Sequence, residues 1–189
     1  MSDKLKKYET IACCGIDCGL CPMYHSEAGS ACPGCGGENF KEKHPACGCL
    51  SCCAVRKGYE VCSECHDYKC ERLSAENVSF DSFVTHKKMF ENLDEIKSNG
   101  IVGFIERQKI RIDILKELIS NYNDGRSKSF YCVSCALLPL DKLQEINQLM
   151  KTQSDSSDLK AINKQLKALL KEAADELKIE LKLTKKEKS

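Results

Sequence analysis

The chain has 189 residues, enough for one ordinary domain or two small ones; fifteen of them are cysteine and none is tryptophan. Its 29 lysines and arginines nearly balance its 28 aspartates and glutamates, and 42% of its residues are hydrophobic. This composition excludes a disordered polyelectrolyte, a basic coat for nucleic acid and a collagen-like chain. No run approaches the roughly 20 apolar residues that a bilayer span needs, so we expect no membrane partner.

The use of the cysteines follows from the compartment that we expect. The N-terminal residues lack the apolar stretch of a secretory signal, so the sequence predicts a cytoplasmic protein, whose thiols are kept reduced. Fifteen is also an odd number, so the cysteines cannot all pair within one chain. Because thiolates bind soft and borderline cations tightly, such dense cysteine indicates metal binding rather than a disulfide framework.

Residues 1–78 hold thirteen of the fifteen cysteines. Large aliphatic side chains are sparse there and show little periodicity, and each contributes only about 1.5–3 kcal/mol when it is buried. Structural zinc contributes on the order of 10–16 kcal/mol per site in small peptides. We therefore predict a cysteine-rich region of loops, turns and short helices that is stabilised by metal.

Residues 79–139 change to a helical pattern. Apolar side chains near a 3.6-residue spacing predict a helix from Ser79 or Asp81 to about Gly100 and a second from Gly100 to Tyr122, before the stop signal at 123–125. We expect the two helices to pack as an antiparallel pair around a small core. A Cys-x2-Cys knuckle at residues 132–135 then closes a single domain with residues 1–78.

Residues 140–189 read as a charged helical tail. A short helix at 140–150 is followed by a break at 154–157 and by a helix after Asp158. The second helix carries a heptad-like apolar stripe: Leu159, Ile162, Leu166, Leu169, Ala173 and Leu177. The stripe favours docking on the chain's own domain; a protein partner or self-association through this helix is the alternative. The lysines at the end, Lys185, Lys186 and Lys188, are expected to fray in solvent. The fold class is therefore mainly α with little regular strand.

The cysteine spacings are typical of metal sites. A two-residue gap lets one tight turn direct both sulfurs at a cation about 2.3 Å away, and five such pairs are present. Twelve cysteines supply three closed four-sulfur zinc sites: Cys14, Cys18, Cys21, Cys32, Cys35, Cys49, Cys53, Cys62, Cys65, Cys70, Cys132 and Cys135. Cys13, Cys47 and Cys52 are left over, and the choice among Cys47, Cys49, Cys52 and Cys53 stays open. One grouping joins Cys32 and Cys35 with Cys132 and Cys135. Twelve thiolates and three zinc ions change the formal charge of +1 to about −5, so nucleic acid is an unlikely partner.

Two rivals to structural zinc stay open. The spacing of Cys14, Cys18 and Cys21 matches that of radical S-adenosylmethionine enzymes, but these need a large βα barrel and no alternating strand–helix pattern is present. A plain iron–sulfur cluster suits the same thiolates. The second rival is a reactive Cys13 with one of three histidines as base: His25, His44 and His66. Of these, His66 is the best alternative metal ligand, and the balance leans away from an enzyme.

The stretch from Ala12 to Cys135 resembles a cysteine-rich prokaryotic family, the domain-of-unknown-function 3795 family. The resemblance rests on Cys14-Gly-x2-Cys18-x2-Cys21-Pro-x-Tyr24, Cys32-x-Gly-Cys35, and Cys53-Ala-x2-Lys57-Gly58-x3-Cys62-x2-Cys65-x4-Cys70-Glu-x-Leu73. It continues with Asn92-Leu93, Gly100 and an aromatic residue beside Cys132-x2-Cys135. The chain departs from the family at Lys69, at Ala136 and in the extra Cys47 and Cys52. The resemblance implies zinc binding and brings no established reaction.

The sequence therefore predicts a small cytoplasmic protein with structural zinc sites of cysteine ligation, acting as an interaction or regulatory module. The alternative is an iron–sulfur or reactive-thiol protein with a redox or enzymatic role.

Overall fold

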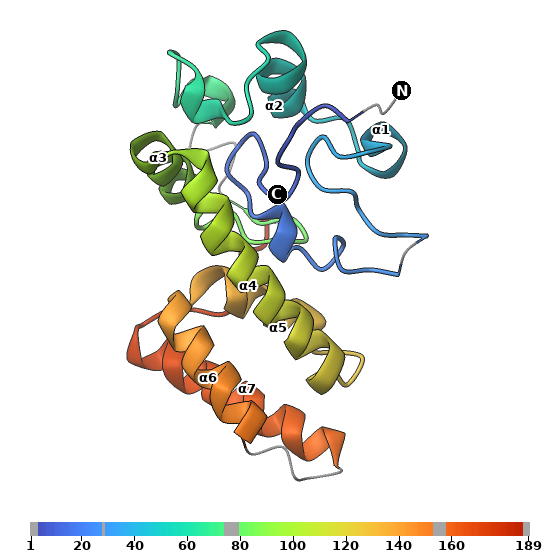
Figure 1. Ribbon diagram of the computed structural model, residues 1–189, viewed down its shortest axis with the longest axis vertical. Helices are drawn as coiled ribbons and strands as arrows, with labels where there is room; N and C mark the ends of the chain where they lie inside the picture. Colours follow the sequence, from blue (N-terminus) through green and yellow to red (C-terminus); the bar gives the residue numbers. More distant parts are fainter. Residues whose placement is uncertain (1–3, 28, 74–79, 153–157, 187–189) are drawn as a thin grey trace. The chain divides into compact units, whose positions relative to one another are not determined.

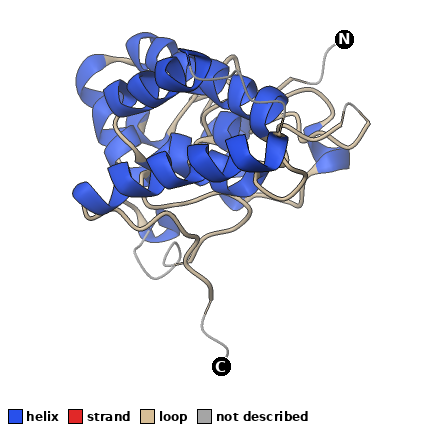
Figure 2. Cartoon of the chain, turned by 90° about the horizontal axis from the view of Figure 1, so that it is seen from below, coloured by secondary structure: helices blue, strands red, loops and turns tan. Residues whose placement is uncertain are grey.

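The computed structural model describes residues 4–27, 29–73, 80–152 and 158–186. In these ranges the regular structure is entirely helical and no strand is present (Figure 2), which confirms the mainly α class. The α-helices are α1 (Phe40–Lys43), α2 (Gly48–Leu50), α3 (Met89–Asn99), α4 (Ile101–Tyr122), α5 (Lys128–Leu137), α6 (Leu140–Thr152) and α7 (Leu159–Glu176), as Figure 1 shows. Four short helical turns accompany them: η1 (Cys18–Leu20), η2 (Ser51–Arg56), η3 (Cys62–Glu64) and η4 (Glu71–Leu73).

The chain divides into two compact units. The first comprises Met1–Gln108 and Leu183–Ser189, and the second comprises Lys109–Lys182. The division therefore falls within α4 and not at residues 78 and 139, where the sequence pattern changes. Each unit has its own set of buried side chains.

In the first unit, α3 packs on the cysteine-rich segment. Its apolar face carries Met89, Leu93 and Ile96, and these side chains join Ile11, Val61, Leu73 and Phe104 in one buried cluster. The expected small core between two helices is thus shared with the cysteine-rich loops, which contribute three of its members. These seven residues span about half of the chain, from Ile11 to Phe104, and they can form one core because α3 supplies a continuous apolar face with a helical spacing.

A second cluster of the first unit is built largely from sulfur. It contains Cys13, Cys35 and Cys53 together with small and apolar neighbours: Ala12, Phe40, Leu50 and Ala54. Five further cysteines pack against it: Cys14, Cys18, Cys47, Cys49 and Cys62. The N-terminal region therefore has few aliphatic side chains in its interior, as its composition predicts, and thiols fill the space between its loops.

The predicted first helix begins later than expected. It starts at Met89 and not at Asp81, while Ser79 lies outside the described residues. Asp81 accepts hydrogen bonds from the N–H of His86 and from Thr85 Oγ1 at 3.5 Å, so its side chain closes a turn that competes with a helix. Its backbone N–H and side chain also bind the backbone of Thr184, at 2.9 and 2.7 Å. These two hydrogen bonds attach the C-terminal segment to Asp81 at Thr184. Lys186 Nζ also lies 5.4 Å from the centre of the Phe80 ring.

The second unit contains the larger part of α4 together with α5, α6 and α7. The predicted helices at 100–122, 140–150 and after Asp158 are all present, and Asp158 caps α7 by accepting a hydrogen bond from the Lys160 N–H at 2.9 Å. The expected break at 154–157 lies outside the described residues. Helices α6 and α7 lie side by side (Figure 1). No helix of the described ranges is long and apolar enough to cross a bilayer.

The buried face of α7 differs slightly from the predicted stripe. Leu166 and Ala173 of the stripe are buried, whereas Leu159 and Leu177 at its ends are 42% and 43% exposed. The remaining buried positions on α7 are Asn163, Leu170 and Ala174. The centre of the stripe is therefore already used inside the unit, as expected for a helix docked on its own domain.

Candidate metal centre

The loop that carries the first cysteines is held by α3. The N–H of Ala12 donates to the carbonyl of Ile16 at 2.8 Å, which folds the chain back on itself. Gly15 has a φ of +89°, and a Cβ there would lie 2.3 Å from the carbonyl oxygen of Met89, so only glycine fits. Asn92 of α3 donates to the Gly15 carbonyl at 2.9 Å. Helix α3 thereby fixes the position of Cys13, Cys14 and Cys18.

Four cysteines from two turns form what we call the first sulfur set: Cys18, Cys21, Cys32 and Cys35. The turn η1 closes with a hydrogen bond from the Cys21 N–H to the Cys18 carbonyl at 3.1 Å. Burial, together with the neighbouring thiols of Cys21 and Cys32, raises the pKa of Cys18 to about 12. A hydrogen bond with the backbone of Cys35 acts on the pKa of Cys18 in the opposite sense. Cysteines of both two-residue turns are therefore neighbours of Cys18.

Four further cysteines form the second sulfur set: Cys14, Cys49, Cys53 and Cys62. They come from the first loop, from α2, from η2 and from η3. A hydrogen bond with Cys14 raises the pKa of Cys49 to about 12, and the charge of Cys62 acts in the same direction. A hydrogen bond with Cys53 lowers the pKa of Cys62. The sulfurs of this set are thus linked in pairs across four segments of the chain.

Cys13 touches both sets. Its thiol is completely buried and makes hydrogen bonds with Cys35 of the first set and Cys53 of the second. These contacts lower the pKa of Cys13 and raise the pKa of both partners, so one thiolate is shared among three sulfurs. The sequence left Cys13 over because neither partner is near it in the chain. Full burial also denies it the solvent access that the alternative role of a reactive thiol needs.

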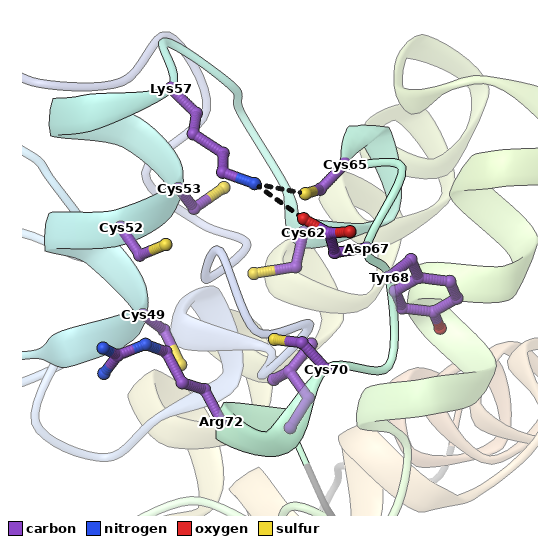
Figure 3. Close-up of a pocket in the computed structure, with 11 residues that line it drawn as sticks. Cys49, Cys52, Cys53, Lys57, Cys62, Cys65, Asp67, Tyr68, Cys70 and Arg72 are labelled. Atoms are coloured by element: carbon purple, nitrogen blue, oxygen red, sulfur yellow. Dashed lines mark hydrogen bonds and ion pairs between the residues drawn. The ribbon is translucent and has the colours of Figure 1, made fainter.

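A cavity of about 200 Å³ adjoins the second sulfur set, and six cysteines line it: Cys49, Cys52, Cys53, Cys62, Cys65 and Cys70. Figure 3 shows the first three on one side of the cavity and the last three on the other. Lys57, Asp67 and Arg72 also line it. Lys57 Nζ lies 2.8 Å from Cys65 Sγ and 3.4 Å from Asp67 Oδ2, and the hydrogen bond with Cys65 raises the pKa of Lys57.

The alternative ligand His66 lies at the edge of this region. Its side chain is 82% exposed, and Nε2 is 3.0 Å from Asp67 Oδ1. The ligand atoms of Cys65, His66 and Asp67 all lie within 4.8 Å of one another. However, these three residues are consecutive and exposed, and the ammonium of Lys57 already contacts two of them. The stronger candidates are the two sulfur sets, whose members come from distant segments and are buried or half-buried.

The sulfur sets have the composition of tetrahedral zinc sites but a looser geometry. Four sulfurs at about 2.3 Å from one zinc ion are about 3.8 Å from one another. In the described residues, the group of three ligand atoms that meets a 4.8 Å limit is the one at residues 65–67. An ion bound in either set would therefore draw its sulfurs together from the pairwise contacts that they make here. All fifteen cysteines are held as thiols rather than disulfides, so every one of these sulfurs offers a ligand atom.

Cys132 and Cys135 lie in the second unit, on α5, and not in a knuckle. The segment Lys128–Leu137 is helical because seven consecutive residues, Tyr131 to Leu137, are buried and a helix satisfies their backbone groups. Arg111 donates to the carbonyls of Cys135 and Leu138 at 2.8 and 2.7 Å, which closes the end of α5. Burial raises the pKa of Cys135 to about 12. The grouping of this pair with Cys32 and Cys35 stays a prediction.

No protein-family model, no curated protein and no solved structure matches this chain. The assignment of a function therefore depends on the geometry and chemistry of the sulfur sets.

Proposed function

We propose that this chain is a metal–thiolate protein in which each sulfur set of the first unit holds one zinc ion. The observation that supports this most directly is that eight cysteines from four separate segments gather in two sets inside one unit. Thiols would not need such convergence merely to fill space, because aliphatic side chains pack equally well and do not oxidise. The two sets account for two of the three zinc ions that the cysteine count predicts.

Zinc suits these ligands better than other divalent cations. Four thiolates in a tetrahedron are the donor set of structural zinc, and such a site has no open position for substrate or water. We therefore propose a role in interaction or regulation, in which metal shapes the surface of the first unit. Membership of the domain-of-unknown-function 3795 family is part of the same proposal. Lys69, one of the departures from that family, has a φ of +66°, which the proline common at that position could not adopt.

The cavity favours an iron–sulfur cluster as the second candidate. Six sulfurs surround a space of about 200 Å³, which is larger than a single ion needs. Lys57 and Arg72 at its wall would compensate the negative charge of a thiolate-ligated cluster. In this alternative the cavity is the functional site and the protein has a redox role.

One experiment separates the two candidates. The protein is purified without oxygen, and its zinc, iron and acid-labile sulfide are measured beside its visible spectrum. We expect two to three zinc ions per chain and no colour, as predicted for three or fewer closed sites. Iron with equimolar sulfide and absorption near 400 nm would instead support the cluster. A folded protein with neither metal would overturn both proposals.

A further inference from the structure

Lys6 is buried beside the two sulfur sets. Its side chain is only 3% exposed, although lysine is almost never buried without a charged partner. Nζ donates to the carbonyl of Ile11 at 2.6 Å. The aliphatic stem passes Gly36, where a Cβ would lie 3.0 Å from Lys6 Cγ, and the N–H of Leu5 binds the Gly36 carbonyl at 2.7 Å. The backbone around Gly36 is thus shaped to admit this side chain.

Among the residues that the structure describes, no carboxylate balances the charge of Lys6. None of the ion pairs between described residues includes it, whereas its neighbour Lys4 pairs with Glu9 at 2.7 Å. Its surroundings are instead rich in sulfur. The preceding Leu5 packs against the buried cluster that contains Cys13, Cys35 of the first set and Cys53 of the second. Lys6 Cγ and Leu50 Cδ1 of that cluster both adjoin Gly36, the residue after Cys35.

Burying an ammonium without an anion is strongly unfavourable, so this arrangement requires negative charge nearby. A metal–thiolate centre supplies this negative charge in a defined amount, because one divalent ion with four thiolates carries a net charge of −2. Two such centres in a buried region would repel each other and would be costly to desolvate. A fixed cation beside both lowers each of these costs.

We propose that Lys6 is the buried counter-ion shared by the two metal–thiolate centres, and that it sets how tightly both centres hold a divalent cation. This inference rests on the proposed function and deepens it. Lys6 contacts no metal, so it acts through the charge of the ligands. Its loss should weaken the two centres together, although they share no ligand.

The test compares Lys6→Met, Lys6→Arg and Lys7→Met in the full chain, with zinc as the metal and a colorimetric chelator as competitor. Lys7 is the matched control, because it is adjacent in the chain and exposed. We expect Lys6→Met to lower zinc affinity by about tenfold or more at both centres, as loss of a buried charge partner does. Lys6→Arg should keep most of the affinity and Lys7→Met nearly all of it.

Three outcomes would overturn the inference: unchanged affinity in Lys6→Met, an equal loss in Lys6→Arg and Lys6→Met, or an equal loss in Lys7→Met. An equal loss with arginine would mean that shape matters and charge does not. If Lys6→Met stays unfolded in saturating zinc, Lys6→Gln takes its place, since glutamine keeps part of the length and none of the charge. Wild-type protein that binds no metal would instead refute the proposed function, so the two failures are distinguishable.

Discussion

Cys52 and Cys53 are adjacent, yet their thiols meet different surroundings. Cys53 is 3% exposed, and hydrogen bonds with Cys13 and then Cys62 raise the pKa of its thiol. Cys52 is half-buried at the cavity wall. The spacing of cysteines along the chain could not separate the two, because both stand at ligand-like distances from other cysteines. The separation depends on which face of η2 turns inward, and this is a tertiary property.

This difference predicts opposite outcomes for two conservative changes. Cys53→Ser should remove a ligand of the second sulfur set and lower the zinc content by about one ion per chain. Cys52→Ser should leave the zinc content unchanged, because Cys52 belongs to neither set. Elemental analysis of the two purified variants measures both results. Wild-type zinc content in both variants would exclude Cys53 as a ligand. Loss of zinc in Cys52→Ser alone would mean that Cys52, and not Cys53, is the ligand.

Asn163 is a buried polar residue in the interior of the second unit. Its Nδ2 lies 2.7 Å from the Tyr122 carbonyl, 2.7 Å from the Tyr131 hydroxyl and 2.9 Å from Ser127 Oγ. The residue is 4% exposed, so water cannot replace these contacts. It links α7 to the end of α4 and to α5, which no apolar pattern could reveal.

We expect Asn163→Ala to destabilise the second unit by about 1–3 kcal/mol, because buried partners lose their hydrogen bonds. Urea unfolding followed by helical circular dichroism measures the change, and Lys164→Ala on the exposed side of α7 is the control. Since Asn163 lies outside the sulfur sets, zinc content should not change. Equal stability of the two variants would show that the network contributes nothing measurable.

At the scale of elements, the accuracy of the sequence-based predictions depended on whether local signals were opposed. Helix α4 was predicted well, because its apolar period runs unbroken to the stop at residues 123–125. The segment before α3 has a similar period, but Asp81 binds the distant backbone of Thr184 and closes a turn. At Cys132 and Cys135 the two-residue gap suggested a knuckle, although the same spacing places both thiols on one side of a helix.

The contact between the first loop and α3 is the element on which the sulfur sets depend. Gly15 packs against Met89 and Leu93. A Cβ at this position would lie 2.3 Å from the Met89 carbonyl oxygen and 2.7 Å from Leu93 Cγ. Asp17, next to this turn, accepts hydrogen bonds from Asn92 and Gln108, both at 2.8 Å. A side chain at Gly15 must therefore move the loop away from α3.

We expect Gly15→Ala to lower zinc affinity and to destabilise the first unit, because it strains a positive φ and displaces the neighbouring cysteines of both sulfur sets, Cys14 and Cys18. Gly103→Ala is the matched control. Gly103 lies within α4, its nearest neighbour would be 3.6 Å from a new Cβ, and alanine there should stabilise the helix by about 1 kcal/mol. Thermal unfolding and zinc titration compare the two variants. A Gly15→Ala protein that binds zinc normally would show that the loop position is not critical.

On the scale of the whole molecule, the two units are stabilised by different interactions. The second unit buries large aliphatic side chains from all four of its helices, among them Leu115, Leu143, Met150 and Leu166. The first unit buries fewer per residue and fills much of its interior with thiols. Composition predicted this contrast, because aliphatic residues are dense after residue 80 and cysteines before it. It could not predict that the division falls within α4.

This contrast leads to a prediction about metal removal. A strong chelator should unfold the cysteine-rich segment at residues 4–73, because without metal the sulfur sets lose about 10 kcal/mol or more per site. The second unit has an independent apolar core, so α5, α6 and α7 should keep their helicity. Hydrogen exchange followed by mass spectrometry distinguishes the segments along the chain. We expect rapid exchange that is limited to the first unit and is reversed by added zinc. Magnesium should restore the protection less fully than zinc, because thiolates bind magnesium poorly. Protection of residues 4–73 that survives complete removal of metal would mean that packing alone holds the cysteine-rich loops.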